Sequence, residues 1–358
     1  MKQVLSLIVC VILLSGCTTI EKEVLDEIYL VTLAGYDLED DKIQATLVVP
    51  IYQTEGTVRN EFYTAEGYLN QELDKEISLQ TPNPVFPGKL EIAMFSEEFA
   101  SKGFIELTDV YRRDPSISAN VRLAVYDGNI KEFIYNQQVQ NMDLGMHVAK
   151  IIEQAIEAEV LPKTNLHLFF QSYYGEGEDP FLPLLTRKNG KLKIKGIALF
   201  KGEKMVDQVL DDRLYIFGVL HNELTKGRLS IELPKQNARV SIGHVKTNKK
   251  VHITGTSSSP NIKLSIDLTG TIDEYSGGRK RVDKNIKKIE NRVNQYLEKE
   301  TQKMINSYQE QGVDPFGIGK EAKAHFRDWD SKTWQEIYPQ VNIQTEINMD
   351  IVQSGVIR

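Results

Sequence analysis

The residue with the clearest chemistry in this sequence is Cys17, which ends the tetrapeptide Leu14, Ser15, Gly16 and Cys17. A cysteine thiolate is a soft nucleophile that can form a thioether with a lipid. Ser15 and Gly16 are small, so a peptidase can reach the backbone next to the cysteine. We therefore predict cleavage before Cys17 and a diacylglyceryl group on its sulfur, and we leave acylation of the new N-terminus open.

The segment before Cys17 has the composition of an export signal. Lys2 makes its start basic, and Val4 to Leu14 form an apolar run of about eleven residues. A helix that crosses a bilayer needs roughly twenty apolar residues, so this run has the length of a secretory signal instead. Because the run ends in the tetrapeptide, it resembles the lipobox of bacterial lipoproteins. We expect a signal peptide at 1–16 and the lipidated cysteine with a polar tether at 17–27; a plain signal peptide with an accidental cysteine is the alternative.

Composition limits what the exported part can do. One acyl chain binds a membrane weakly, whereas the two chains of a diacylglyceryl group anchor a protein stably. The formal net charge of −7 argues against nucleic acid and against a polybasic membrane patch. The other cysteine, Cys10, lies in the signal, so the exported part has no thiol left for a disulfide. We expect an ectodomain on the outer, extracytoplasmic face of the cell membrane, held there by lipid on Cys17.

Catalytic and metal-binding patterns are weak. The six histidines have no HExxH spacing, and the sequence contains no CxxC pair and no G-x-S-x-G elbow. His244 and His252 fall in neighbouring predicted strands and could meet around a metal, but we favour ordinary strand histidines. The acidic runs 37–41 and 176–179 lack the order of a calcium loop, and 316–320 lacks the spacing of a phosphate loop. We predict no enzyme, no metal and no cofactor.

One further polar cluster is a candidate interaction site, formed by Arg112, Arg113, Asp114 and Pro115. Two guanidinium groups before an Asp-Pro turn can bind a carboxylate. The alternative, which we favour, is an ion pair between Arg113 and Asp114 that stabilises the turn.

The elements expected in residues 28–190 form a mixed α/β region. Apolar β-branched residues on both sides of the acidic turn 37–41 predict a β-hairpin. Apolar periodicity and capping residues predict helices, and further apolar runs predict strands. These elements are hairpin strands at 28–35 and 42–52, helices at 64–79, 96–103 and 143–159, and strands at 89–95 and 119–126. Composition changes between 171 and 191, and we place a domain boundary after residue 190.

Residues 191–358 are expected to form a second α+β region. Strict alternation of apolar and polar residues at 261–271 and 341–351 marks half-buried strands, which we interpret as antiparallel. One apolar stripe marks a long helix at 283–310. Strands at 191–200, 228–233, 238–245 and 250–256 and a helix at 211–220 complete this region. The predicted fold class is α+β with two to three α/β subdomains: a mixed N-terminal region and a C-terminal antiparallel sheet packed by one long helix.

Several segments in the same order resemble one family, the Ger(x)C spore-germination lipoproteins. They are LEI at 90–92 with SEEFASKG at 96–103, YRRDPSI at 111–117, KGIALFK at 195–201 with KMV at 204–206, and DPFGIG at 314–319 before 334–339 and the final strand. The resemblance runs from Cys17 essentially to Arg358. Family members commonly place a tryptophan after the lipidated cysteine, where this sequence has Thr18. That departure leaves the lipidation prediction untouched.

The resemblance implies that the chain is the C subunit of a nutrient germinant receptor needed for endospore germination. It implies three α/β subdomains, two in residues 28–190 and one in a GerAC-type domain at 191–358, and it implies no catalysis. It also implies assembly with two integral-membrane partners, the A and B subunits, at the inner membrane of the dormant spore. Whether this subunit binds the germinant directly is left open.

Two other classes of protein compete with this hypothesis. The first is a membrane-anchored extracytoplasmic lipoprotein that binds a small molecule; such proteins have two lobes around a hinged cleft and a repeated βαβ pattern, which this sequence lacks. The second is a surface hydrolase, which no nucleophile, base or metal spacing supports. The leading hypothesis is therefore a lipid-anchored, non-catalytic receptor subunit.

Overall fold

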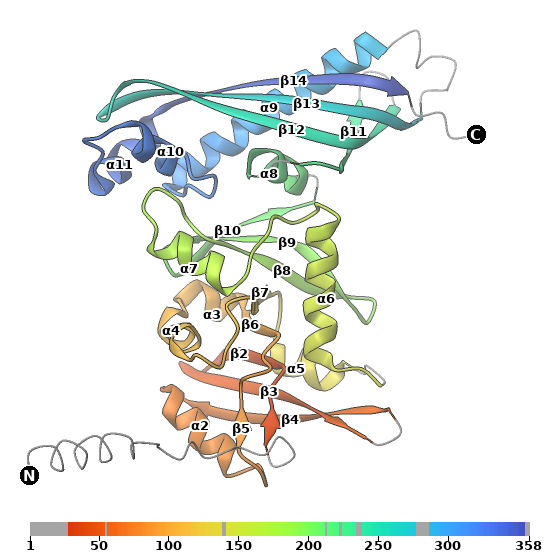
Figure 1. Cartoon of the computed structure of the whole chain (residues 1–358), viewed down its shortest axis with the longest axis vertical. Helices are drawn as coiled ribbons and strands as arrows, with labels where there is room; N and C mark the ends of the chain where they lie inside the picture. The colour runs from red at the N-terminus through yellow and green to blue at the C-terminus, as the bar shows by residue number, and fades with distance from the viewer. Residues whose placement is uncertain are drawn as a thin grey trace, which may run out of the picture.

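Two β-sheets dominate the molecule. The computed structural model describes residues 28–53, 56–137, 141–211, 213–221, 224–233, 238–276 and 286–354. One sheet has eight strands and the other has four, and a short parallel pair joins β1 (Tyr29–Leu30) to β5 (Val85–Phe86). Figure 1 shows the eight strands stacked along the long axis from β4 at one end to β10, with the four-stranded sheet beyond β10.

The eight-stranded sheet has a parallel centre and antiparallel ends. Strands β2, β6, β7 and β8 run parallel, whereas hairpins add β3 and β4 at one end and β9 and β10 at the other. The strands are β2 (Leu33–Glu39), β3 (Lys42–Tyr52), β4 (Val58–Gly67), β6 (Ile92–Ser96), β7 (Arg122–Tyr126), β8 (Phe181–Lys188), β9 (Lys191–Lys201) and β10 (Lys204–Leu210). All five residues of β6 are buried, as expected for a parallel strand that is covered on both faces.

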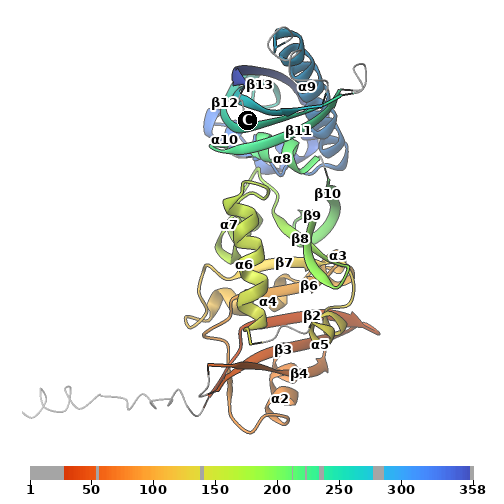
Figure 2. The same cartoon turned by 90° about the vertical axis from the view of Figure 1, so that its right-hand side faces the viewer.

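Helices cover both faces of this sheet. On one face, α2 (Asn70–Ser78), α3 (Glu97–Lys102), α4 (Ile105–Arg113) and α7 (Leu166–Tyr174) pack against a cluster that contains Phe95. On the other face, α5 (Ile130–Asn136) and α6 (Leu144–Glu157) pack against Ile92 and Met94. Figure 2 views the molecule from the α6 side. The alternation of neighbouring β6 residues between the two clusters follows from the period of two in a strand.

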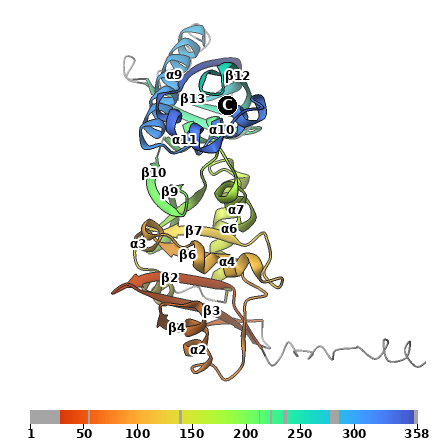
Figure 3. The same cartoon turned by 90° about the vertical axis from the view of Figure 1, so that its left-hand side faces the viewer.

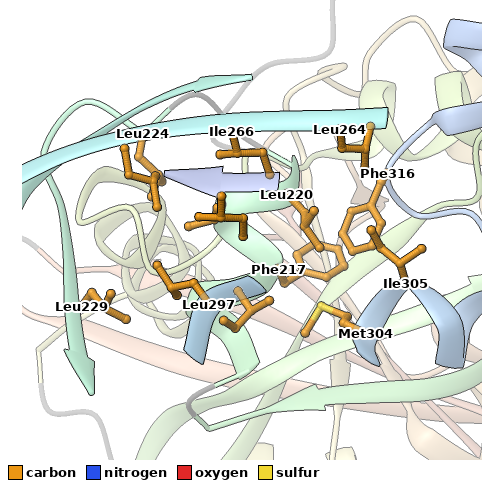
Figure 4. Close-up of a cluster of buried hydrophobic side chains, with 14 of the residues drawn as sticks. Phe217, Leu220, Leu224, Leu229, Leu264, Ile266, Leu297, Met304, Ile305 and Phe316 are labelled. Atoms are coloured by element: carbon orange, nitrogen blue, oxygen red, sulfur yellow. The ribbon is translucent and has the colours of Figure 1, made fainter. Parts of the chain in front are cut away.

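The C-terminal sheet packs one face against helices and leaves the other exposed. Its strands are β11 (Gly227–Leu233), β12 (Ala238–Thr256), β13 (Ser259–Tyr275) and β14 (Asn342–Ser354), and its helices are α8 (Arg213–His221), α9 (Ile286–Gln311), α10 (Ile318–His325) and α11 (Ser331–Ile337), followed by a 3-10 turn at Tyr338–Gln340. Figure 4 shows the core, in which Phe217 of α8 and Met304 of α9 lie below Ile266 of β13. Phe217 is completely buried.

The predicted fold class is confirmed, but one strand direction was wrong. Strands β11, β12 and β13 are antiparallel, whereas β14 pairs parallel to β13. The chain leaves β13 at Tyr275, passes through α9, α10 and α11, and enters β14 at Asn342, beside Asn261 at the opposite end of β13. Alternation shows that a strand is half-buried; it does not show the direction of the strand. A parallel strand keeps this pattern here because helices cover only one face of the sheet.

Two other predicted elements also differ from the structure. Residues 64–67 continue β4 instead of starting a helix, and α2 begins only at Asn70. The two predicted strands at 238–245 and 250–256 are a single strand, β12. His244 and His252 are therefore eight positions apart on one strand, about 26 Å at the usual rise per residue. They cannot share a metal ion.

The expected boundary at residue 190 falls in the turn between β8 and β9. Strands β9 and β10 continue the eight-stranded sheet, and their inner faces belong to the same hydrophobic cluster as α8, α9 and β12 to β14. Leu161 and Phe181, which precede residue 190, lie in that cluster with Ile197 and Val209, which follow it. The two halves therefore share one hydrophobic cluster, and the division at residue 190 stays a prediction.

Candidate interaction surface

The sequence cluster at 112–115 lies at the end of α4, where proline ends the helix. Asp114 precedes Pro115 and adopts an extended backbone, because proline disfavours the helical region for the residue before it. One carboxylate oxygen of Asp114 accepts hydrogen bonds from the backbone N–H (2.8 Å) and the hydroxyl (2.6 Å) of Ser116. Asp114 thus stabilises the turn through Ser116, and the predicted ion pair with Arg113 was wrong.

The partner of both arginines is Asp109, one turn earlier on α4. Its Oδ1 lies 2.9 Å from a terminal nitrogen of Arg112, and its Oδ2 lies 2.6 Å from Nε of Arg113. The spacings i,i+3 and i,i+4 place all three side chains on one face of the helix. The hydrogen bond from Arg112 lowers the pKa of Asp109. One carboxylate therefore serves two guanidinium groups, and the second acidic side chain of the cluster, Asp114, bonds Ser116 instead of an arginine.

Aromatic side chains of α7 support Arg112 from the other side. The guanidinium carbon lies 5.4 Å from the ring centroid of Tyr174 and 5.9 Å from that of Phe170, within the range of a cation–π contact. The ring of Tyr174 stacks on Phe170 at 5.7 Å and is 58% exposed. Arg112 is thus fixed between a carboxylate and two rings.

A groove lies beside this cluster, between α4 and α7. It has a volume of about 360 Å³ and is lined by Tyr111, Arg112, Ile117, Ala119, Leu166, His167, Phe170 and Gln171. Val110, on the exposed side of α4, is 47% exposed. We call the groove together with Asp109, Val110, Arg113 and Tyr174 the α4–α7 surface. Figure 3 shows α4 and α7 on the side of the molecule that also carries α10 and α11. The α4–α7 surface therefore offers a guanidinium group, aromatic rings and an apolar groove for non-covalent binding.

A second polar assembly, which the sequence analysis missed, joins the two halves. The acidic, glycine-rich loop 175–180 is not a free solvated loop, because it packs against residues 312–320. Asp179 accepts a hydrogen bond from the backbone N–H of Asp314 (2.8 Å) and donates its own backbone N–H to the carbonyl of Asp314 (2.8 Å). Lys201 bonds Asp179 at 3.2 Å and the carbonyl of Gly312. We call this assembly the junction.

The junction explains the glycines of the 314–319 motif. A Cβ on Gly319 would lie 2.4 Å from Nε1 of Trp334 and 2.7 Å from the Cα of Gly177 in the acidic loop, and Gly317 has a φ of +66°. Asp314 is buried and accepts hydrogen bonds from the backbone N–H groups of Ile318 (3.0 Å) and Gly319 (2.7 Å). Burial raises the pKa of Asp314 to about 7. The segment that was compared with a phosphate loop therefore packs against the acidic loop 175–180.

Other titratable groups serve the fold. Asp37, in the acidic run 37–41, is buried and accepts hydrogen bonds from the backbone N–H groups of Ile130 and Lys131 at the start of α5. His221 is half-buried, and its Nδ1 lies 3.2 Å from the carbonyl oxygen of Pro315; desolvation lowers its pKa to about 4. Among the described residues, no group of three or more His, Cys, Asp or Glu side chains could hold a metal ion.

The lipobox residues Leu14, Ser15, Gly16 and Cys17 lie outside the described residues, so lipidation of Cys17 stays a prediction. Within the part of the chain that the structure describes, we find no helix with the length and apolar character needed to cross a membrane.

Comparisons with known proteins cover almost the whole chain. Residues 21–187 match the family model "Spore germination protein N-terminal domain", and residues 195–355 match "Spore germination B3/ GerAC like, C-terminal". The spore germination protein GerQC of Bacillus cereus is 28% identical over 360 residues, which is 99% of each chain. The putative spore germination protein YfkR of Bacillus subtilis is 24% identical over 380 residues, 99% of this chain and 97% of its own.

A solved structure has a similar fold. The crystal structure of the GerBC protein aligns with a TM-score of 0.55 and 15% identity, and it covers 89% of this chain and 96% of the GerBC chain. The two family models match both halves of the sequence in the expected order. They confirm the resemblance that was noted in the sequence. The chain belongs to the Ger(x)C, or GerAC-like, family of spore germination proteins.

Proposed function

We propose that the chain is the lipid-anchored, non-catalytic C subunit of a nutrient germinant receptor. It is held by lipid on Cys17 at the outer face of the membrane that becomes the inner membrane of the dormant spore. It acts there by assembly with integral-membrane A and B subunits. The observation that carries this proposal is the match of both family models along the whole chain.

The α4–α7 surface supports a role in protein contact. Tyrosine and arginine are enriched at the centres of protein interfaces, where a few of them supply most of the binding energy. Tyr174 is 58% exposed, and the side chain of Arg112 is 46% exposed. A membrane anchor would add to this surface by raising the local concentration of the subunit near its partners.

The shared core favours a rigid subunit over a hinged binding protein. Phe181 of β8 and Phe217 of α8 pack edge to face at 5.4 Å, and both belong to the cluster that connects the two halves. A hinged cleft needs two lobes that separate easily. Without a hinged cleft, a small-molecule-binding lipoprotein would need a binding site of another kind. The hollow at the junction is the candidate: it has a volume of about 350 Å³ and is lined in part by Tyr173, Asp179, Asp314 and Trp334.

The decisive experiment is affinity purification of the full-length chain from membranes of dormant spores. We expect two multi-spanning proteins to co-purify with it. Cys17→Ala should release the chain from the membrane and reduce co-purification and germination, whereas Cys10→Ala, in the signal, is the matched control and should change neither. Isolation of the chain alone, or membrane retention and normal germination of Cys17→Ala spores, would contradict the proposal. Micromolar binding of a sugar or amino acid to the purified full-length chain in detergent would instead favour the alternative.

A further inference from the structure

We propose that the groove of the α4–α7 surface receives a segment of a membrane partner subunit that carries an apolar side chain next to a carboxylate. This inference rests on the proposed function, because it takes the occupant to be a receptor partner. It goes further by stating the chemistry of the segment and the residues that recognise it.

The walls of the groove select the apolar part of the occupant. Ile117 and Leu166 are buried residues of the cluster beneath the groove, and Tyr111 packs against that cluster. The ring of Phe170 forms a further wall. Phe169, next to Phe170 on α7, is buried in the same cluster as Ile117 and Leu166. An aromatic or large aliphatic side chain that enters such a site is stabilised by roughly 25 cal/mol for each Å² of apolar surface that it removes from water.

The charges around the groove select a carboxylate. Arg112 is the one permanently charged side chain among the lining residues, which include no Asp or Glu; Tyr111 and His167 are the other titratable groups. Arg112 and Arg113 share the carboxylate of Asp109, whereas Asp114 bonds Ser116, so neither guanidinium group has a carboxylate of its own. Arg113 is 74% exposed. A partner carboxylate would complete the pairing with charge-assisted hydrogen bonds.

Arg112 is held in place before any partner arrives. Nε and a terminal nitrogen are fixed by Asp109 at 3.0 and 2.9 Å, and the rings of Phe170 and Tyr174 support the guanidinium plane. A side chain that is already ordered loses little conformational entropy on binding. Asp109 therefore acts as a positioning residue: it holds one edge of the guanidinium group, so that another edge can bind the carboxylate of a partner.

The test uses site-specific photo-crosslinking in dormant-spore membranes. A benzoylphenylalanine is placed at Ala119, an exposed residue that lines the groove, in the full-length chain, and the crosslinked peptide is identified by mass spectrometry. Asn248, which is exposed on β12, is the control position. We expect the Ala119 adduct to be a partner peptide with an Asp or Glu within about one helical turn of a large apolar residue.

Charge variants then test recognition. Arg112→Glu should reduce the Ala119 adduct by about tenfold, because the loss of one partner in a charge pair costs more than 1.4 kcal/mol. Arg112→Lys, which keeps the charge but not the planar fork, should give an intermediate yield. Replacement of the mapped partner carboxylate by Arg should restore crosslinking to the Arg112→Glu chain. Circular dichroism of each purified variant confirms that it is folded.

The outcomes separate this inference from the proposed function. An adduct with lipid, an adduct with a peptide that lacks a nearby carboxylate, or absence of an adduct while two membrane subunits still co-purify would overturn the inference and leave the proposed function in place. Failure of co-purification from wild-type membranes would overturn the proposed function and, with it, this inference.

Discussion

Asp179 and Asp314 are joined by two hydrogen bonds across the junction, although 135 positions separate them in the sequence. The backbone N–H of Asp314 donates to the carboxylate of Asp179, and the backbone N–H of Asp179 donates to the carbonyl of Asp314, both at 2.8 Å. An acidic loop and a turn, which look like solvent-exposed segments in the sequence, thus hold the two halves of the molecule together.

Removal of the Asp179 carboxylate should loosen the junction. Asp179→Ala leaves the N–H of Asp314 without its acceptor, and an unsatisfied buried donor costs about 1–3 kcal/mol. We expect the free energy of unfolding in urea to fall by that amount and amide exchange at 312–320 to increase. Glu176→Gln, which removes an exposed ion pair with Lys323, is the control and should cost less than about 1 kcal/mol. Equal effects of the two variants would contradict a structural role of Asp179.

The buried carboxyl of Asp314 should make stability depend on pH. Burial raises its pKa from 3.8 to about 7, so the folded protein holds this proton more tightly than the unfolded chain does. Its contribution to stability is therefore greatest at low pH, falls as the pH rises from about 4 through 7, and stays low above that range. Asp314→Asn removes this titration. In urea unfolding between pH 5 and 8, we expect the wild type to lose stability relative to Asp314→Asn as the pH rises; parallel curves would refute the assignment.

The shared core predicts that a change in α8 affects both halves. Phe217 is completely buried and lies near Phe181 of β8 (5.4 Å) and Phe316 (5.1 Å). Phe217→Ala should cost about 3–5 kcal/mol through lost burial and the cavity that remains. Hydrogen exchange should increase in β8 to β10 as well as in the C-terminal helices. Val206→Ala, at a residue that is 46% exposed, should stay within about 0.5 kcal/mol. Faster exchange in only one half would contradict a common core.

Polar side chains of α9 should protect the free edge of β14. Gln302 donates to the carbonyl of Ile343 (2.8 Å) and accepts from the N–H of Thr345 (3.1 Å), and Asn294 accepts from the N–H of Met349 (2.6 Å). An uncovered strand edge is a site for pairing with another chain. We expect Gln302→Ala to cost about 1–2 kcal/mol and to form oligomers on heating, measured by light scattering. Gln295→Ala, at an exposed amide of the same helix, should do neither.

Local patterns predicted much of the fold for physical reasons. The alternation of β13 and the apolar stripe of α9 depend only on which face each residue turns toward the core, and both elements lie close to where they were expected. The helix predicted at 143–159 also corresponds to α6. The start of the helix predicted at 64–79 was placed too early. Residues 64–67 extend β4, because pairing with β3 outweighs a weak local preference for helix.

The candidate site shows where sequence reasoning ends. The residue types at 112–115 indicated an interaction site, but the partner of the arginines, Asp109, follows from helical geometry that the motif alone did not reveal. The aromatic support from Phe170 and Tyr174 comes from another helix and has no signal in the spacing of the motif.

The sequence by itself determined the family, the fold class and the prediction of lipidation at Cys17, because these depend on the order of residues along the chain. Only the tertiary structure decided the parallel direction of β14, the core that the two halves share and the contact between Asp179 and Asp314. A contact between distant segments forms where buried apolar surface and satisfied hydrogen bonds outweigh the entropy lost in closing the chain between them. Both terms depend on which surfaces meet in space, and the spacing of residues along the chain does not show which surfaces meet.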